Sequence, residues 1–273
     1  MRSLRMAIRD WVQAFVAAIQ FLTRIPLPYT FTYTDDHFRR SVIFYPFAGL
    51  LIGVIVSIAG SLLDSVFPVF ICGIILVALW TSLSGALHLD GLMDLADGLL
   101  SHRSRERMLE IMKDSRVGAM GVIVCVFYVL LKTALVISLL EDRNLEWLLL
   151  LQLIPVWSRS FMVTAIAGWP YARKGQGLGA LYRSVGWKHA FISGIGAAII
   201  STAIIFPLGS WSTAEAGIVL LSMALVTYGI GAGVASAVSR KLGGLTGDVY
   251  GALNECIELG LLAALAGYAY NLG

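Results

Sequence analysis

The sequence is short of charged residues. Only 14% of its 273 residues are Asp, Glu, Lys or Arg and 58% are apolar, whereas soluble domains carry about 25% charged residues. A single globular core of this size cannot bury so much apolar surface, so we expect a membrane protein. The composition excludes a disordered chain, a collagen-like chain and a nucleic-acid-binding domain. The 20 basic and 17 acidic residues nearly balance and do not point to a partner.

Cysteine is scarce as well. Cys72, Cys125 and Cys256 lie far apart within apolar runs, and no C-x-x-C spacing occurs. A disulfide framework and a cysteine metal site are therefore not expected, and these residues are interpreted as small buried hydrophobic groups. Walker, nucleophile-elbow and H-E-x-x-H motifs are also absent from the sequence.

Apolar runs are what the sequence has in abundance. Seven runs of 20–24 residues are nearly free of charge, and each is long enough for a helix to cross about 30 Å of hydrocarbon. None alternates polar and apolar residues, so strands are not expected. We therefore expect an all-α, polytopic membrane helix bundle with about seven spans, forming a single domain over residues 1–273. The expected spans are 41–63, 66–87, 117–140, 147–169, 189–208, 216–239 and 250–271.

The basic residues are distributed very unevenly between the loops. Outside the spans, 17 Lys and Arg residues fall on one side of the expected bundle and one falls on the other. The positive-inside rule then places the N-terminus in the cytoplasm and the C-terminus outside. The N-terminal apolar run, 11–22, is too short to span and lacks a cleavage site. It is interpreted as an amphipathic helix on the cytoplasmic membrane surface.

Acidic residues gather first in the segment 88–121. Asp90, Asp94 and Asp97 follow one another at i, i+4 and i+7, which places them on one narrow face of a helix. Like charges at this spacing destabilise a helix, and a divalent cation would remove the repulsion. Mg²⁺ is favoured because it takes hard oxygen ligands and shares its shell with phosphates. A solvated polar face is the alternative.

Glycines flank these acids at positions 91, 98, 118 and 121. Two interpretations stay open: close helix packing in the membrane, or room for a bulky phosphate ester to approach a metal. After a short expected surface helix at 104–113, with Ser104 as its N-cap, come Asp114 and Arg116. Asp114 could complete a metal shell or take a proton, and Arg116 could bind a phosphate.

A second acidic cluster lies at 243–259. Asp248 and Glu255 share a helix face, and Asn254 and Glu258 lie on the same side. Anions at such a depth are costly unless a cation, a proton or a polar cavity accepts them. A structural role in helix pairing is the alternative.

Basic residues form a third set. Arg159 lies inside an apolar run and is expected to meet a carboxylate or a phosphate. The loop 171–183, which contains Arg173 and Lys174, is rich in glycine and could cradle a pyrophosphate, although such loops are common. His88 and His102 bracket the acidic stripe, and a hydrogen-bonded role is favoured over metal ligation or acid–base catalysis. Together these features indicate metal-assisted transfer of a phosphate ester at the membrane surface.

Five fragments spread over residues 21–258 resemble the cobalamin synthase family, the adenosylcobinamide-GDP ribazoletransferases. They are FLTRIPLP, HLDGLMDLADGL, MKDSRVGAMG, YARKGQGLG and GLTGDVYGALNE. The resemblance implies a Mg²⁺-dependent multi-pass enzyme of the bacterial inner membrane with its active site on the cytoplasmic side. It implies that adenosylcobinamide-GDP and α-ribazole, or α-ribazole 5′-phosphate, give adenosylcobalamin or its phosphate, with GMP leaving. The sequence is compatible with a homo-oligomer and does not set the oligomeric state.

With this chemistry, the candidate residues take distinct expected roles. Metal ligands are expected at Asp90, Asp94 and Asp97. Catalytic carboxylates are expected at Asp114, Asp248 and Glu255, with the identity of the general base left open. The expected substrate-binding residues are Arg24, Arg116, Arg159, Arg173, Lys174 and Asn254.

Two rival functions are considered. A CDP-alcohol phosphotransferase signature opens D-x-x-D-G, which matches residues 94–98, but the Ala-Arg pair and the later D-x-x-x-D are missing. A cation-coupled transporter would also carry acidic residues in its spans. Transporter sites usually lie near the middle of the bilayer, whereas the acids here gather at one face, which favours an enzyme.

Overall fold

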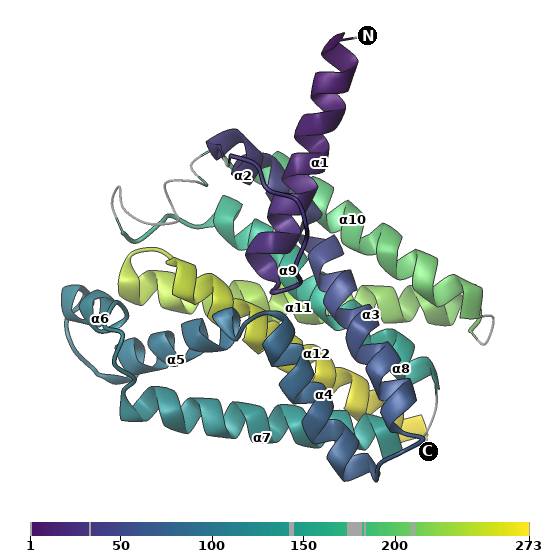
Figure 1. Cartoon of the computed structure of the whole chain (residues 1–273). Helices are drawn as coiled ribbons and strands as arrows, with labels where there is room; N and C mark the ends of the chain where they lie inside the picture. The colour runs from purple at the N-terminus through teal and green to yellow at the C-terminus, as the bar shows by residue number, and fades with distance from the viewer. Residues whose placement is uncertain are drawn as a thin grey trace.

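The computed structural model describes residues 2–32, 34–141, 145–173, 182, 184–208 and 211–272, and within them it is helical with one isolated β-bridge and no strand (Figure 1). The expected all-α class is therefore confirmed. In chain order the elements are α1 (Arg2–Leu22), α2 (Asp35–Ser41), η1 (Val42–Phe44), α3 (Tyr45–Leu63), α4 (Val69–Leu83), α5 (Leu87–Leu100), α6 (Arg105–Ile111), α7 (Ala119–Glu141), α8 (Leu145–Leu151), α9 (Leu153–Gly168), α10 (Trp187–Ile205), η3 (Phe206–Leu208), α11 (Thr213–Leu242) and α12 (Gly247–Leu272).

Six helical segments among the described residues are long and apolar enough to cross a membrane, and α4 with α5 forms a bent pair that could be a seventh. The expectation of about seven spans is confirmed in this form. The spans that contain α9 and α12 are largely buried, whereas α7, α10 and α11 expose large apolar side chains such as Phe127, Phe191 and Leu225. Because such surfaces are stable only in an apolar solvent, α9 and α12 form the centre and the other three face lipid.

The expected span 66–87 is wrong in its detail. Helix α4 has 15 residues, about 22 Å at 1.5 Å per residue, and α5 leaves it at an angle of 88°. Gly85 and Ala86 adopt left-handed backbone angles, with φ of +64° and +57°, which no α-helix can continue. Hydropathy gave no signal of this break because both helices are apolar. With 14 residues, α5 is too short to span and lies outside the six spans.

The two ends of the bundle are each tied together by hydrogen bonds between loops. At one end Ala172 N–H donates to Leu245 O and Leu245 N–H donates to Pro170 O, both at 2.8 Å, and Arg105 Nε donates to Leu242 O at 2.7 Å. At the other end Trp211 Nε1 donates to Glu146. The loops α5–α7, α9–α10 and α11–α12, which carry most of the basic charge, therefore meet at one end.

The N-terminal helix is longer than the apolar run that predicted it. Residues 2–22 are helical, and the first half projects away from the bundle (Figure 1). From Trp11 onward, Ala18 and Leu22 are buried, whereas Trp11 and Phe15 are exposed. The amphipathic helix is confirmed, and its place on the membrane surface stays a prediction. The short helix after Ser104 is also confirmed, because Ser104 Oγ accepts the Arg107 N–H.

The uneven basic charge predicts which end faces the cytoplasm. In a variant without native cysteines, we expect Lys113→Cys, at the basic end, to be protected from a membrane-impermeant thiol reagent in intact cells. We expect Ala214→Cys, at the opposite end, to be labelled. Both positions are exposed on the protein. Permeabilised cells provide the control, since both variants should then react. Labelling of position 113 alone in intact cells would invert the topology.

Candidate active site

The site begins with a close contact between α5 and α12. A Cβ at Gly91 would lie 2.5 Å from the Asp248 carbonyl oxygen, and a Cβ at Gly251 would lie 3.1 Å from the His88 Cα. Glycine is needed at both positions because any side chain would push the two backbones apart. Of the two interpretations of Gly91, this geometry supports helix packing. The contact brings the acidic face of α5 against the first turn of α12.

Carboxylates crowd this contact. Asp90 is exposed, while Asp94 and Asp248 are half-buried. Burial raises the pKa of Asp94 to about 7, and repulsion from Asp90 and Asp248 adds to the effect. No described residue donates a hydrogen bond to Asp90 or Asp94. Asp248 is different, because Arg173 Nη2 lies 2.9 Å from its Oδ2. The two carboxylates of α5 therefore have no hydrogen-bonded cation among the described residues, whereas Asp248 has one.

The carboxylate of Asp97 is hydrogen-bonded to the backbone at the start of α7. Its Oδ2 accepts the Gly118 N–H and its Oδ1 accepts the Gly121 N–H, both at 2.8 Å. A carboxylate there satisfies N–H groups that a helix start leaves unpaired, and its charge is favourable at that end of the helix dipole. The structure thus gives Asp97 an anchoring role, and metal ligation by this residue stays a prediction. A Cβ on either glycine would collide with the carboxylate.

No group of three His, Cys, Asp or Glu side chains among the described residues is arranged to hold a metal ion. Both carboxylate oxygens of Asp97 are bonded to the start of α7, so the three acids of α5 do not form such a group. Asp90 and Asp94 are the two members that remain open to a ligand. A site built on them would need further oxygen ligands from water or substrate.

The other residues that were expected to bind phosphate or to act as catalytic carboxylates lie around the basic end of the bundle. Asp114 and Arg116 form a local ion pair at 2.6 Å on an exposed turn, and the hydrogen bonds from Arg116 lower the pKa of Asp114 to about 2. Arg24 is exposed and crosses the α4–α5 break, with its N–H bonded to Leu83 O at 2.7 Å. Lys174 and most of the loop 171–183 lie outside the described residues.

A network of buried charges ties the spans together behind this site. Glu258 on α12 accepts Lys132 Nζ from α7 and Arg159 Nη1 from α9, each at 2.6 Å, and all three side chains are at most 2% exposed. Lys132 also lies 3.4 Å from Glu255 and 4.4 Å from the centre of the Trp80 ring. Two cations and two anions are thus enclosed with balanced charge.

Three expected site residues belong to this network. Arg159 meets a carboxylate, as its place in an apolar run indicated, but the carboxylate belongs to Glu258. Glu255 bonds to Tyr128 and Lys132, and Asn254 Nδ2 donates to Glu258 at 3.2 Å. None of the three lines the cavity beside α5. This geometry gives them a structural role, and the catalytic role expected for Glu255 and the substrate contacts expected for Arg159 and Asn254 stay predictions. The lone Lys132 inside an apolar run was the signal for a buried partner.

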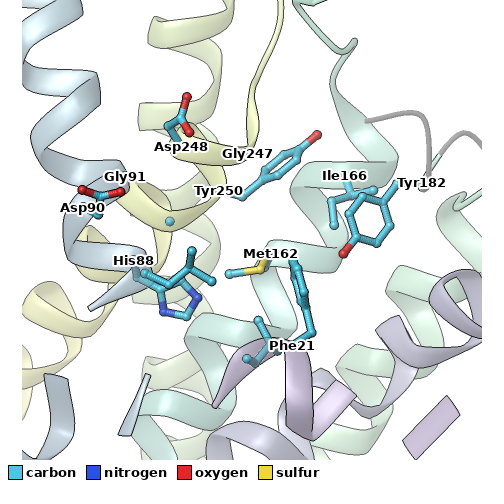
Figure 2. A pocket seen from close by; sticks show the side chains of 13 residues that line it. Phe21, His88, Asp90, Gly91, Met162, Ile166, Tyr182, Gly247, Asp248 and Tyr250 are labelled. Carbon is cyan, nitrogen blue, oxygen red and sulfur yellow. The ribbon is translucent and has the colours of Figure 1, made fainter. Parts of the chain in front are cut away.

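A cavity opens beside the carboxylates (Figure 2). It holds about 90 Å³, or about 560 Å³ with its open mouth. Asp90 and Asp248 border it from α5 and α12. The imidazole of His88 is 2% exposed, and both of its ring nitrogens lack a partner among the described residues. Burial, together with the nearby positive charge of Arg159, lowers the pKa of His88 to about 3. The expected hydrogen-bonded histidine is therefore not observed.

Comparison with known proteins gives a consistent result. The family model for cobalamin-5-phosphate synthase matches residues 14–266. The adenosylcobinamide-GDP ribazoletransferase of Desulfitobacterium hafniense is 38% identical over 89% of this chain and 92% of its own length. The enzymes of the same name from Brevibacillus brevis and Pseudomonas aeruginosa PAO1 are also 38% identical. They cover 94% and 95% of this chain and 98% and 100% of their own lengths. No solved structure gives a significant match.

The anchoring role of Asp97 predicts a stability effect. Asp97→Asn keeps one acceptor but turns an amide NH₂ toward a backbone N–H, so we expect a loss of about 1–2 kcal/mol in the free energy of unfolding. Asp94→Asn should cause no loss, because it relieves repulsion. Thermal unfolding of both variants in detergent, without added metal, makes the comparison. Equal stability of Asp97→Asn and the unaltered protein would contradict the anchoring role.

The buried network predicts a larger effect. Lys132→Met leaves Glu258 and Glu255 with one cation between them, and an uncompensated buried charge costs about 3–5 kcal/mol. We expect Lys132→Met to unfold at a markedly lower temperature and the double variant with Glu258→Gln to recover part of the loss. Lys113→Met, at an exposed position, is the control. Glu258→Gln alone completes the cycle, and a loss of stability in the double variant equal to the sum of the two single losses would show that the two residues are not coupled.

Proposed function

We propose a specific reaction for this chain, which belongs to the cobalamin-5-phosphate synthase family and is therefore a transferase of cobalamin biosynthesis. It joins adenosylcobinamide-GDP to α-ribazole or its 5′-phosphate and releases GMP. The observation that carries the proposal is the open anionic pair, Asp90 and Asp94, beside the Asp248–Arg173 ion pair at the mouth of a cavity. A divalent cation bound to this surface would neutralise the two carboxylates and, at the same time, the diphosphate of the substrate.

The reaction is a displacement at phosphorus. A ribose hydroxyl oxygen of the acceptor forms a bond to the phosphorus nearer the corrinoid, and the bond from that phosphorus to the bridging oxygen breaks. The bridging oxygen leaves with the electron pair as part of GMP, and the hydroxyl proton passes to a base or to water. Charge neutralisation and alignment of the two substrates are the main requirements of such a step.

Mg²⁺ fits the residues that are present. It commonly binds proteins through one or two carboxylates and fills its shell with water and substrate phosphate oxygens. Asp90 and Asp94 provide two carboxylates, one turn apart on α5, with no described residue bonded to them. When bound, the ion would neutralise the diphosphate and help GMP to leave. Asp97 would hold α5 against α7 and so fix the direction of the pair.

The remaining residues have positional roles in this proposal. Asp248 would accept a hydrogen bond from the acceptor hydroxyl, and the bond to Arg173 keeps its carboxylate in place. Arg24 and Arg116 are exposed at the same end and would bind the outer phosphate charge. The basic loops at this end support a cytoplasmic active site in the bacterial inner membrane.

The experiment measures GMP release from a GDP-activated corrinoid and α-ribazole by the detergent-solubilised protein, with Mg²⁺ varied. We expect release to require Mg²⁺ and to fall by about 10²-fold or more in Asp90→Asn and Asp94→Asn, because each removes a charge that holds the metal. Raised Mg²⁺ should restore part of the loss.

Glu106→Gln is the matched control, because this carboxylate is exposed at the same end of the molecule on α6. It should release GMP at the normal rate. Normal turnover in both Asn variants would refute the metal site, and a lack of GMP release by the unaltered protein would refute the reaction.

A further inference from the structure

The cavity beside α5 has an unusual combination of walls. Most of its lining is apolar, with Phe21 from α1 and Met162 and Ile166 from α9 facing the open space. Figure 2 shows His88 at the lower part of this space beside Met162 and Phe21, and Asp248 at the upper side. A deep apolar part thus leads to a polar mouth.

His88 is a buried polar group of the deep part. The Tyr182 hydroxyl, which also lines the cavity, is already hydrogen-bonded to the hydroxyl of Tyr45. Its backbone is fixed by the close approach of Gly251, and its ring lies in the cavity with neither nitrogen bonded to a described residue. A buried polar group without a partner costs about 1–3 kcal/mol, so its retention here calls for an explanation. An imidazole in this position can donate one hydrogen bond from N–H to a ligand or accept one.

We propose that this cavity receives the heteroaromatic base of the acceptor nucleoside, with His88 hydrogen-bonded to a ring nitrogen of that base. The inference rests on the proposed function and deepens it by assigning the acceptor subsite. The chemical class is a flat, largely apolar bicyclic ring of the benzimidazole type, with one pyridine-like nitrogen. Phe21 and Met162 supply the aromatic and sulfur contacts that such a ring favours.

The cavity fits the benzimidazole-type base of the acceptor better than the guanine of the GDP-activated substrate. Guanine carries donors and acceptors around most of its edge and would need several polar partners. The buried wall offers the imidazole of His88, which has no partner among the described residues, and two tyrosines, of which Tyr182 is already bonded to Tyr45. The corrinoid is too large for a space of about 560 Å³. A nucleoside whose base lies over His88 also directs its ribose to the mouth, where Asp90 and Asp248 lie.

The first test measures binding without turnover. Benzimidazole and indole are titrated separately into the detergent-solubilised full chain by calorimetry, because indole has the same shape but no pyridine-like nitrogen. We expect the unaltered protein to prefer benzimidazole by roughly tenfold, and His88→Leu to bind the two equally. Equal binding by the unaltered protein, or an unchanged preference in His88→Leu, would overturn the proposal.

The second test separates the subsite from the reaction. In the GMP-release assay, His88→Leu should raise the KM for α-ribazole by roughly tenfold and leave the KM for the corrinoid substrate unchanged. Thr164→Val is the matched control, since Thr164 is also buried without a partner among the described residues but does not line the cavity. It should change neither KM. A rise in both KM values together with a lower unfolding temperature would show a structural role for His88 and refute the subsite.

The two tests fail in different ways. If no GMP is released by the unaltered protein, the proposed reaction is wrong, and the benzimidazole preference still decides whether the cavity recognises such a ring. If GMP is released normally but the ring preference is absent, the reaction stands and the subsite does not.

Discussion

The ion pairs of Glu258 are the interaction on which the arrangement of the spans depends. One carboxylate of α12 binds a lysine of α7 and an arginine of α9, so three helices meet at one point in the interior. Burying these ions is costly, and the cost is offset only when every charge has its partner in good geometry. Apolar packing between helices is tolerant of sliding, whereas this junction is not. It sets the depth at which α12 stands relative to its neighbours.

That depth determines where the acidic helix lies. Because α12 begins at Gly247 and packs closely on α5 through Gly91 and Gly251, fixing α12 also fixes α5. The bond between Asp97 and the start of α7 holds the far side of α5. The open carboxylates thus stand on a helix that is held from two directions, which limits how far their mutual repulsion can displace them. Preorganisation of this kind is what electrostatic catalysis requires.

The sequence predicted the class of fold and the end of the molecule that carries the site, but not the partners of single side chains. Hydropathy located the helices because lipid demands long apolar runs. It missed the break at Gly85 and Ala86, which depends on two backbone angles. The stripe of acids on α5 was visible from spacing alone. The role of Asp97 could not be predicted, because it depends on hydrogen bonds from backbone amides 21 and 24 residues away in the sequence. The carboxylate that pairs with Arg159 is likewise 99 residues away.

The β-bridge between Tyr171 and Leu245 has a mechanical consequence. Arg173 lies two residues after Tyr171, and Asp248 lies three residues after Leu245. Both members of the ion pair therefore belong to one hydrogen-bonded unit. Such a unit moves cooperatively when the structure opens locally. Any local opening of this unit would carry the cation and the anion together and keep their separation. The electrostatic character of the wall is then independent of how wide the entrance stands.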